Sequence, residues 1–175
     1  MKQNIAFAGF GLSCLNALFS ILALALNAWI EYSDDDGRYQ SSGLWKSCTG
    51  YRSVFRCVEI LPVLPVGKHG QILAVRAFVA MGMLLMLGAA VTAGVRVFLM
   101  KDKRIIYLAT VGLSIAAGFC LLVGFATYAS EFGESVTLGR SKYAAGFALC
   151  VVAWLFSWVQ AGMFFVHGRM PDSPA

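Results

Sequence analysis

Charged residues are scarce in this sequence of 175 residues, at 13%, whereas soluble domains contain about 25%. The scarcity excludes an ordinary water-soluble domain. The hydrophobic content of 59% and the mean hydropathy of +0.72 indicate a protein that lies in a lipid bilayer. The formal net charge of +5 comes from basic residues scattered around the apolar stretches, so we expect no nucleic-acid partner.

Clusters of catalytic or metal-binding residues are also missing. The sequence has two histidines, His69 and His167, and the topology predicted below places them on opposite sides of the membrane. It has no Cys-x-x-Cys pair of the kind that quinone-linked redox enzymes need, and no Ser-His-Asp set can be assembled from it. We therefore expect no enzyme activity, no metal site and no cofactor, although topology alone still permits a small membrane enzyme of the glutathione type.

Long apolar stretches are the main feature that the sequence does contain. A membrane-spanning helix needs ~20 predominantly apolar residues. Four stretches meet this length, at residues 5–30, 77–100, 105–128 and 143–166. The first is longer than the roughly 7–15 apolar residues of a signal peptide and lacks a clear cleavage site, so we interpret it as a retained span. Residues 1–175 are thus predicted to form a single tetraspan domain, an all-α four-helix bundle.

Two arguments predict which side of the membrane each loop occupies. The turn at residues 101–104 has three cations in four residues, which favours the cytoplasmic side for this turn and for both termini. The loop at residues 31–71 has five cations of its own, so the charge count alone does not decide. Cys48 and Cys57 are the cysteines outside the spans, and a disulfide between them persists only on the oxidising side. Loops 31–71 and 129–142 are therefore expected outside the cell or in the lumen.

The larger loop has the pattern of a β-hairpin. Residues 53–60 are rich in β-branched and aromatic side chains and roughly alternate in polarity, so they predict a strand. Residues 43–48 are the expected partner strand and residues 49–52 the turn. Cys48 and Cys57 can approach within disulfide reach across such a hairpin, the alternative being two free thiols. Because two strands alone are marginally stable, we expect Trp45 and Leu44 to be buried against the helix ends.

Several of these residues together resemble the W–GLW–C–C signature of the claudin superfamily. That superfamily includes the claudins, the peripheral myelin and epithelial membrane proteins, the lens fibre membrane intrinsic protein and the calcium-channel γ subunits. The matching residues are Trp29, Gly43, Leu44, Trp45, Cys48 and Cys57. Arg76 lies where the family has an arginine at the start of the second span, and residues 142–149 resemble the opening of the fourth. The resemblance implies a four-helix membrane bundle with a small disulfide-linked extracellular antiparallel β-sheet.

The subfamily stays open, because the sequence departs from each subfamily in some respect. Residues 171–175 lack the PDZ-binding Tyr-Val ending of classical claudins, so we do not expect attachment to junctional scaffolds. The short tail and the short second loop resemble the lens and epithelial members, whereas the longer first loop resembles a claudin. No Asn-x-Ser/Thr sequon is present, unlike in many myelin and epithelial relatives.

The resemblance implies a structural protein of the plasma membrane that organises cell–cell contacts or junctions. It would act by self-association of its extracellular sheet, with copies on the same or the facing membrane. One alternative is an auxiliary subunit that binds other membrane proteins, such as an ion channel or transporter. A second alternative is a claudin that forms a paracellular channel.

The candidate interaction surface combines a sheet edge, exposed apolar residues and charges of both signs. Its residues are Asp34, Asp35, Asp36, Arg52, Arg56, Val63 and Leu64. The alternative for Val63 and Leu64 is that they fold over the helix ends. The alternatives for the acidic run at 34–36 are a solvated turn without a specific role and a surface that attracts cations. Arg76 is predicted to connect the second span to the sheet, the alternative being extension of its side chain to the lipid headgroups.

Overall fold

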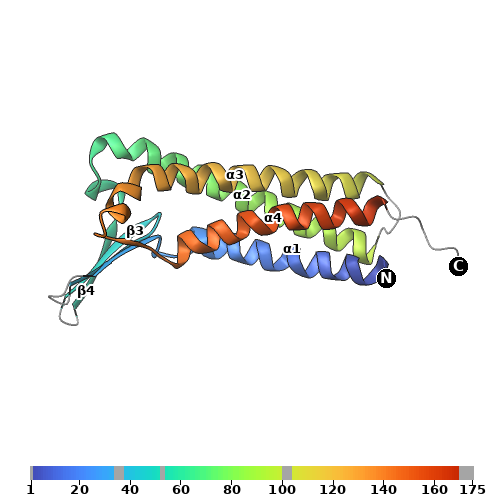
Figure 1. Ribbon diagram of the computed structural model, residues 1–175, viewed down its shortest axis with the longest axis horizontal. Helices are drawn as coiled ribbons and strands as arrows, with labels where there is room; N and C mark the ends of the chain where they lie inside the picture. Colours follow the sequence, from blue (N-terminus) through green and yellow to red (C-terminus); the bar gives the residue numbers. More distant parts are fainter. Residues whose placement is uncertain (1, 34–37, 52–53, 100–103, 170–175) are drawn as a thin grey trace, which may run out of the picture.

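The computed structural model describes residues 2–33, 38–51, 54–99 and 104–169, and within them the chain forms four helices and one five-stranded antiparallel sheet (Figure 1). The helices are α1 (Lys2–Ala25), α2 (Val66–Phe98), α3 (Arg104–Thr137) and α4 (Ala145–Arg169). The strands are β1 (Ile30–Ser33), β2 (Arg38–Ser42), β3 (Lys46–Tyr51), β4 (Val54–Glu59) and β5 (Lys142–Tyr143), and a short 3-10 helix η1 (Leu61–Val63) precedes α2. The predicted helix bundle with a small disulfide-linked sheet is confirmed.

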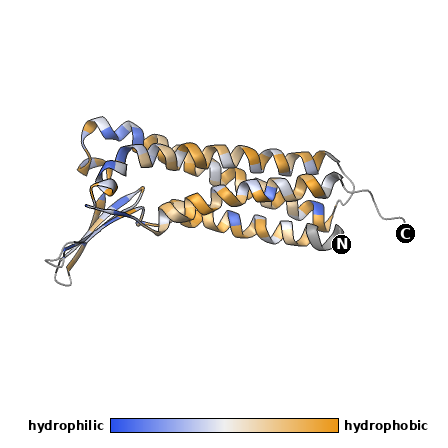
Figure 2. Cartoon of the chain, viewed as in Figure 1, coloured by the Kyte–Doolittle hydropathy of each residue, from blue (hydrophilic) through white to orange (hydrophobic). Residues whose placement is uncertain are grey.

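Each helix contains a stretch that is long and apolar enough to cross a membrane. These stretches are Ala6–Ala25, Val66–Phe98, Ile105–Thr137 and Ala145–Val166. Apolar residues run along the helices, while polar residues gather at the end that bears the sheet (Figure 2). Large hydrophobic side chains remain exposed on the outside of the bundle, which is the arrangement expected when lipid is the solvent. The chain is therefore a multi-pass membrane protein.

The helix ends differ from the bounds expected from hydropathy. Helix α2 begins at Val66, ahead of the predicted span at residues 77–100, and α3 continues to Thr137, past residue 128. The two helices therefore project beyond α1 and α4 at the sheet end (Figure 1). Lys68 joins these projections, because its Nζ donates to the Glu131 carbonyl oxygen at 3.1 Å and lies 5.2 Å from the centre of the Phe132 ring.

The strands are ordered β4-β3-β2-β1-β5 across the sheet. The first four come from the segment between α1 and α2, and β5 comes from the connection between α3 and α4. The predicted hairpin turn at residues 49–52 is wrong, because residues 49–51 belong to β3 and pair with β4. Residues 43–45, which were predicted as strand, leave the sheet and contact the helix ends. The sheet is thus longer and more firmly attached than a single hairpin.

Glycines allow α2 and α3 to approach closely in the bundle. A Cβ atom on Gly82 would lie 2.8 Å from Leu121, and one on Gly124 would lie 2.8 Å from Val79. Small residues at such positions permit the van der Waals contact that holds helices together in lipid. Gly112 has no such neighbour within 4 Å. The recurrence of glycine along these helices therefore serves helix packing at some positions and not at others.

Candidate interaction site on the anchored sheet

Trp29 joins the sheet to the helix bundle. The side chain is fully buried, and its indole Nε1 donates to the Ala23 carbonyl oxygen at 2.7 Å. The ring centre lies 4.8 Å from that of Tyr128. The backbone N–H of Trp29 donates to the Ser42 carbonyl oxygen at 2.9 Å, and the Trp29 carbonyl oxygen accepts from the backbone N–H of Ala144 at 3.0 Å. One residue thereby contacts the end of α1, the side of α3, strand β2 and the residue that follows β5.

Two glycines lie where the chain passes closest to this tryptophan and its neighbours. A Cβ atom on Gly146 would lie 2.6 Å from Cδ1 of Trp29. A Cβ atom on Gly43 would lie 2.6 Å from the carbonyl oxygen of Leu26. The absence of a side chain at both positions therefore lets the sheet segments lie directly against the end of α1.

Leu44 and Trp45 contact the helix ends in different ways. Leu44 is fully buried, whereas Trp45 is 43% exposed, so the predicted burial of Trp45 is wrong. The indole Nε1 of Trp45 still donates to the Leu24 carbonyl oxygen at 2.9 Å. A tryptophan that is apolar on one side and hydrogen-bonded at its N–H suits the boundary between a membrane and water. Trp29, and not Trp45, is the tryptophan that fills the core.

Arg76 extends from α2 to the same segment. Its Nε donates to the Leu44 carbonyl oxygen at 2.7 Å, and its guanidinium carbon lies 4.6 Å from the centre of the Trp45 ring. The side chain therefore contacts the loop that leads into β3, and is not directed only at lipid or water.

We predict that Arg76→Lys destabilises the protein, because an ammonium group cannot reproduce both the Nε hydrogen bond and the flat contact with Trp45. A hydrogen bond made by a charged group contributes about 1.5–3 kcal/mol, so the free energy of unfolding should fall by roughly this amount. Thermal unfolding of the protein in detergent micelles measures the change. Arg56→Lys on exposed β4 is the matched control, and an equal loss in both variants would contradict the prediction.

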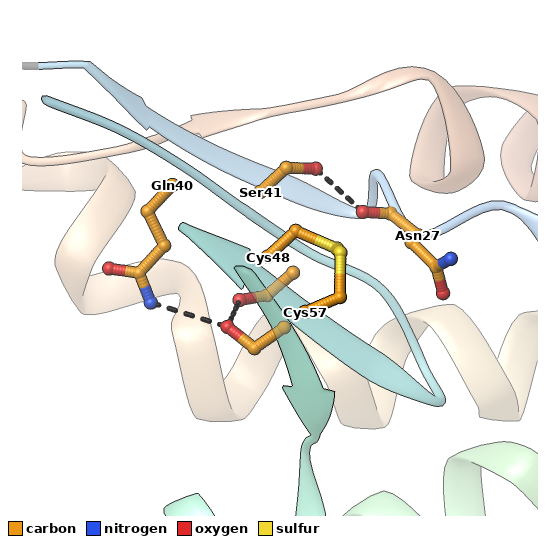
Figure 3. The surroundings of a disulfide bond; sticks show 7 residues. Asn27, Gln40, Ser41, Cys48 and Cys57 are labelled. Carbon is orange, nitrogen blue, oxygen red and sulfur yellow. Dashed lines mark hydrogen bonds between the residues drawn. A yellow bond between two sulfur atoms is a disulfide. The ribbon is translucent and has the colours of Figure 1, made fainter. Parts of the chain in front are cut away.

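The disulfide between Cys48 and Cys57 links β3 to β4 (Figure 3). The two residues are direct partners in the sheet, with their Cα atoms 4.0 Å apart. On the neighbouring strand, Ser41 Oγ donates to the Asn27 carbonyl oxygen at 2.6 Å. The predicted disulfide is confirmed, and it fixes the register of β4 against the part of the sheet that is bonded to the bundle.

We expect Cys48→Ser together with Cys57→Ser to lower stability by about 2–3 kcal/mol, the value for closing a loop of this length. The loss should be confined to the sheet, because the helix bundle does not depend on this bond. Hydrogen exchange of the β3 and β4 amides would report it, with the amides in the middle of α3 as the internal reference. Unchanged exchange in β4 would contradict the prediction.

The two faces of the sheet differ in charge. Side chains alternate between faces along each strand, so Cys48, Cys57 and Ser41 share one face, which we call the disulfide face. Here Lys46 lies directly opposite Glu59, and Glu31 lies opposite Lys142. Burial raises the pKa of Tyr39, and a hydrogen bond to the Glu31 carboxylate raises it further. The carboxylates of this face are therefore matched by cations or by a phenol.

The opposite face borders two neighbouring clefts. The outer cleft, of about 590 Å³, is lined by Tyr32, Arg38, Tyr39, Gln40, Thr49, Gly50, Val54 and Arg56. The inner cleft, of about 370 Å³, shares Tyr32 and Gln40 with it and reaches Phe132, Ser135 and Arg140 at the outer end of α3. Gln40 Nε2 donates to Ser47 Oγ at 3.4 Å, and Ser42 and Ser47 share a hydrogen bond of 2.7 Å on the same face.

Strand β4 is an exposed edge of the sheet. All six of its residues are exposed, and its apolar members Val54, Phe55 and Val58 are 65%, 70% and 51% exposed. Strand β3 lies on one side of β4, and among the described residues no strand lies on the other. An edge of this kind carries backbone groups that can pair with another chain.

The predicted interaction residues lie in different places. Arg56 is exposed on β4, and Val63 is 61% exposed, whereas Leu64 packs against the core cluster. The acidic run at 34–36, Asp34, Asp35 and Asp36, and the cation Arg52 lie outside the described residues. Arg140 also lies beside β1 and β2, and no local pattern in the sequence indicates this position. Among the described residues, no group of three or more His, Cys, Asp or Glu lies close enough to bind a metal ion.

Comparison with known proteins adds two findings. The model of a family described as the PMP-22/EMP/MP20/Claudin family matches residues 4–170. Epithelial membrane protein 1 of Oryctolagus cuniculus is 23% identical to this chain over 156 residues, which cover 88% of the chain and 89% of the relative. Both matches extend over nearly the whole length, including the helices and the sheet described above.

Proposed function

Because this chain belongs to the PMP-22/EMP/MP20/Claudin family, we propose that it organises cell–cell contacts by self-association of its sheet. The sheet faces the outside of the cell, and both termini face the cytoplasm. The disulfide supports this orientation, since it requires the oxidising side, and so do the three cations at residues 101–104. The family is one of structural membrane proteins associated with junctions, which agrees with this role.

The exposed β4 edge is the observation that carries the proposal. A strand with every residue exposed, three large apolar side chains among them, offers both backbone hydrogen bonds and apolar contact area to another copy. The disulfide holds this strand in register, so the edge is presented in one conformation. A preorganised edge loses little conformational entropy when it associates.

The test uses cells that do not adhere on their own. The wild-type protein is expected to concentrate at contacts where both neighbouring cells express it, and not where only one does. Phe55→Lys with Val58→Lys places charges on the edge, at residues that do not line the clefts, and should abolish this enrichment. Val66→Lys, at an 84% exposed valine that begins α2, is the matched control and should retain it.

Two further chains separate this role from binding to a cytoplasmic partner. A chain that ends at Val166 should still cluster at contacts, whereas one with inert linkers in place of residues 31–71 and 129–142 should not. The opposite pattern would contradict the proposal. If the intact protein does not cluster at contacts at all, the role of an auxiliary subunit for a channel or transporter becomes the better explanation.

A further inference from the structure

The two clefts on the sheet face opposite the disulfide are neighbours, because Tyr32 and Gln40 line both. We treat them together and call them the cationic groove. It runs from Val54 and Arg56, near the end of the sheet away from the helices, to Arg140 beside α3. The hydroxyl and amide groups of Gln40, Thr49, Ser42 and Ser47 lie along it. The groove therefore offers hydrogen bonds along its length and cations near both ends.

The described residues that line the groove carry more positive than negative charge, with Arg38, Arg56 and Arg140 against Glu31. Arg56 and Arg140 are exposed, and within the described part of the chain neither guanidinium has a hydrogen-bond or ion-pair partner. Among the described residues that border the groove, Glu31 is the one that has a carboxylate. Its carboxylate, however, accepts a hydrogen bond from Tyr39 on the disulfide face. The groove thus presents positive charge, in contrast to the disulfide face, where Glu31 and Glu59 lie opposite lysines.

The sequence of this chain contains a matching acidic segment. Asp34, Asp35 and Asp36 connect β1 to β2, and they form its densest cluster of negative charge. The paired strand ends that flank this connection, Ser33 and Tyr39, lie at the end of the sheet away from the helices. These strand ends and the outer end of the groove therefore lie at the same end of the sheet, which is the end that would meet a copy on a facing membrane.

We propose that the cationic groove of one copy receives the Asp34–Asp36 segment of a second copy on the facing membrane. The inference rests on the proposed function and identifies its recognition element. Guanidinium groups bind carboxylates through short, paired, charge-assisted hydrogen bonds, and a hydroxyl-lined floor satisfies the remaining acceptors. Two copies related by twofold symmetry make this contact twice, since each contributes one acidic segment and one groove.

Reversal of the charges tests the pairing directly. One variant carries Asp34→Lys, Asp35→Lys and Asp36→Lys, and the other carries Arg56→Glu and Arg140→Glu. Each variant should fail to aggregate cells that express it alone, with aggregation reduced about tenfold, because like charges then face each other. Cells that express the first variant should aggregate with cells that express the second, because both contacts between them again join opposite charges.

The control exchanges charges on the other face. Lys46→Glu with Glu59→Lys keeps the cross-strand pair and the net charge, and should aggregate cells as the wild type does. Surface delivery and the melting temperature of every variant are measured in parallel, so that a folding defect is distinguished from lost recognition. Raising the salt concentration should weaken wild-type aggregation and the rescued mixture to the same extent.

The outcomes distinguish this inference from the proposed function. If the wild type aggregates cells but the mixed variants do not, the groove is not the receptor for the acidic segment, and edge association alone accounts for adhesion. The same conclusion follows if the acidic variant aggregates normally, as it would if the segment paired within its own chain. If removal of cell-surface sulfated glycans abolishes wild-type aggregation, the groove binds a glycan and the inference is overturned. If the wild type does not aggregate cells, both proposals fail.

Discussion

Replacement of Trp29 by alanine is expected to lower the free energy of unfolding by about 3–5 kcal/mol, the range for removing a large buried aromatic side chain. The ring is fully buried and contacts Tyr128, and its indole N–H is bonded to Ala23. The truncation therefore leaves a cavity between α1, α3 and α4 and a carbonyl oxygen without its donor. Thermal unfolding in detergent measures the loss, and surface biotinylation should show retention of the variant inside the cell.

Trp45→Ala is the matched control for this prediction. Trp45 also donates its indole N–H to a carbonyl oxygen at the end of α1, but its ring is 43% exposed. Because less apolar surface is buried, its loss should cost clearly less than the loss of Trp29. A larger effect at Trp45 than at Trp29 would show that the attachment of the sheet depends on the outer tryptophan instead.

Gly43→Ala is the second substitution with a large expected effect. The added methyl group would lie 2.6 Å from the Leu26 carbonyl oxygen and also against the Asn27 backbone, and backbone atoms cannot turn aside as a side chain can. Overpacking typically costs 1–3 kcal/mol, so we expect a loss of about 3 kcal/mol, toward the upper end. The segment that carries Leu44 should shift away from α1, which weakens its hydrogen bond to Arg76.

Two glycines provide controls for this substitution. Gly50→Ala meets the ring of Phe55, which is 70% exposed and can move, so the loss should be smaller. Gly70→Ala has nothing within 4 Å and lies inside α2, so alanine should be neutral or slightly stabilising. Melting temperatures of the variants test this order. Equal stability of the Gly43 and Gly70 variants would contradict it.

The two proposals use different groups of the same sheet, although Val54 and Arg56 of β4 also border the cationic groove. The β4 edge supplies backbone groups and apolar side chains, whose contacts depend little on salt, whereas the groove supplies charge, whose contacts weaken with salt. Edge variants should therefore weaken adhesion at every salt concentration, and groove variants mainly at low salt. The same cell-aggregation assay distinguishes the contributions.

Some features of this protein follow from the sequence alone, because they depend on short segments. Apolar runs of sufficient length determine that the helices cross the membrane, since unpaired backbone groups are not tolerated in lipid. The disulfide was also predictable, because Cys48 and Cys57 are close in sequence and lie outside the spans. The presence of a strand before α2 followed from the alternation and the β-branched residues of 53–60.

Other features were decided by contacts between distant segments. Whether Trp29 or Trp45 fills the core depends on Tyr128 and Gly146, which lie more than 80 residues further along the chain. The fifth strand, β5, exists because Ala144 bonds to Trp29 and Tyr143 pairs with Ile30. Local patterns carry no information on such partners.

The charge of each sheet face was likewise set by strand register, because a shift of one residue moves every side chain to the opposite face. The sequence therefore determined that this is a membrane bundle with a cross-linked sheet on one side. Only the tertiary structure decided that Arg56 and Arg140 line neighbouring clefts while Glu31 bonds to Tyr39 on the other face, since these residues are brought near one another by pairing across four strands and by two connecting segments.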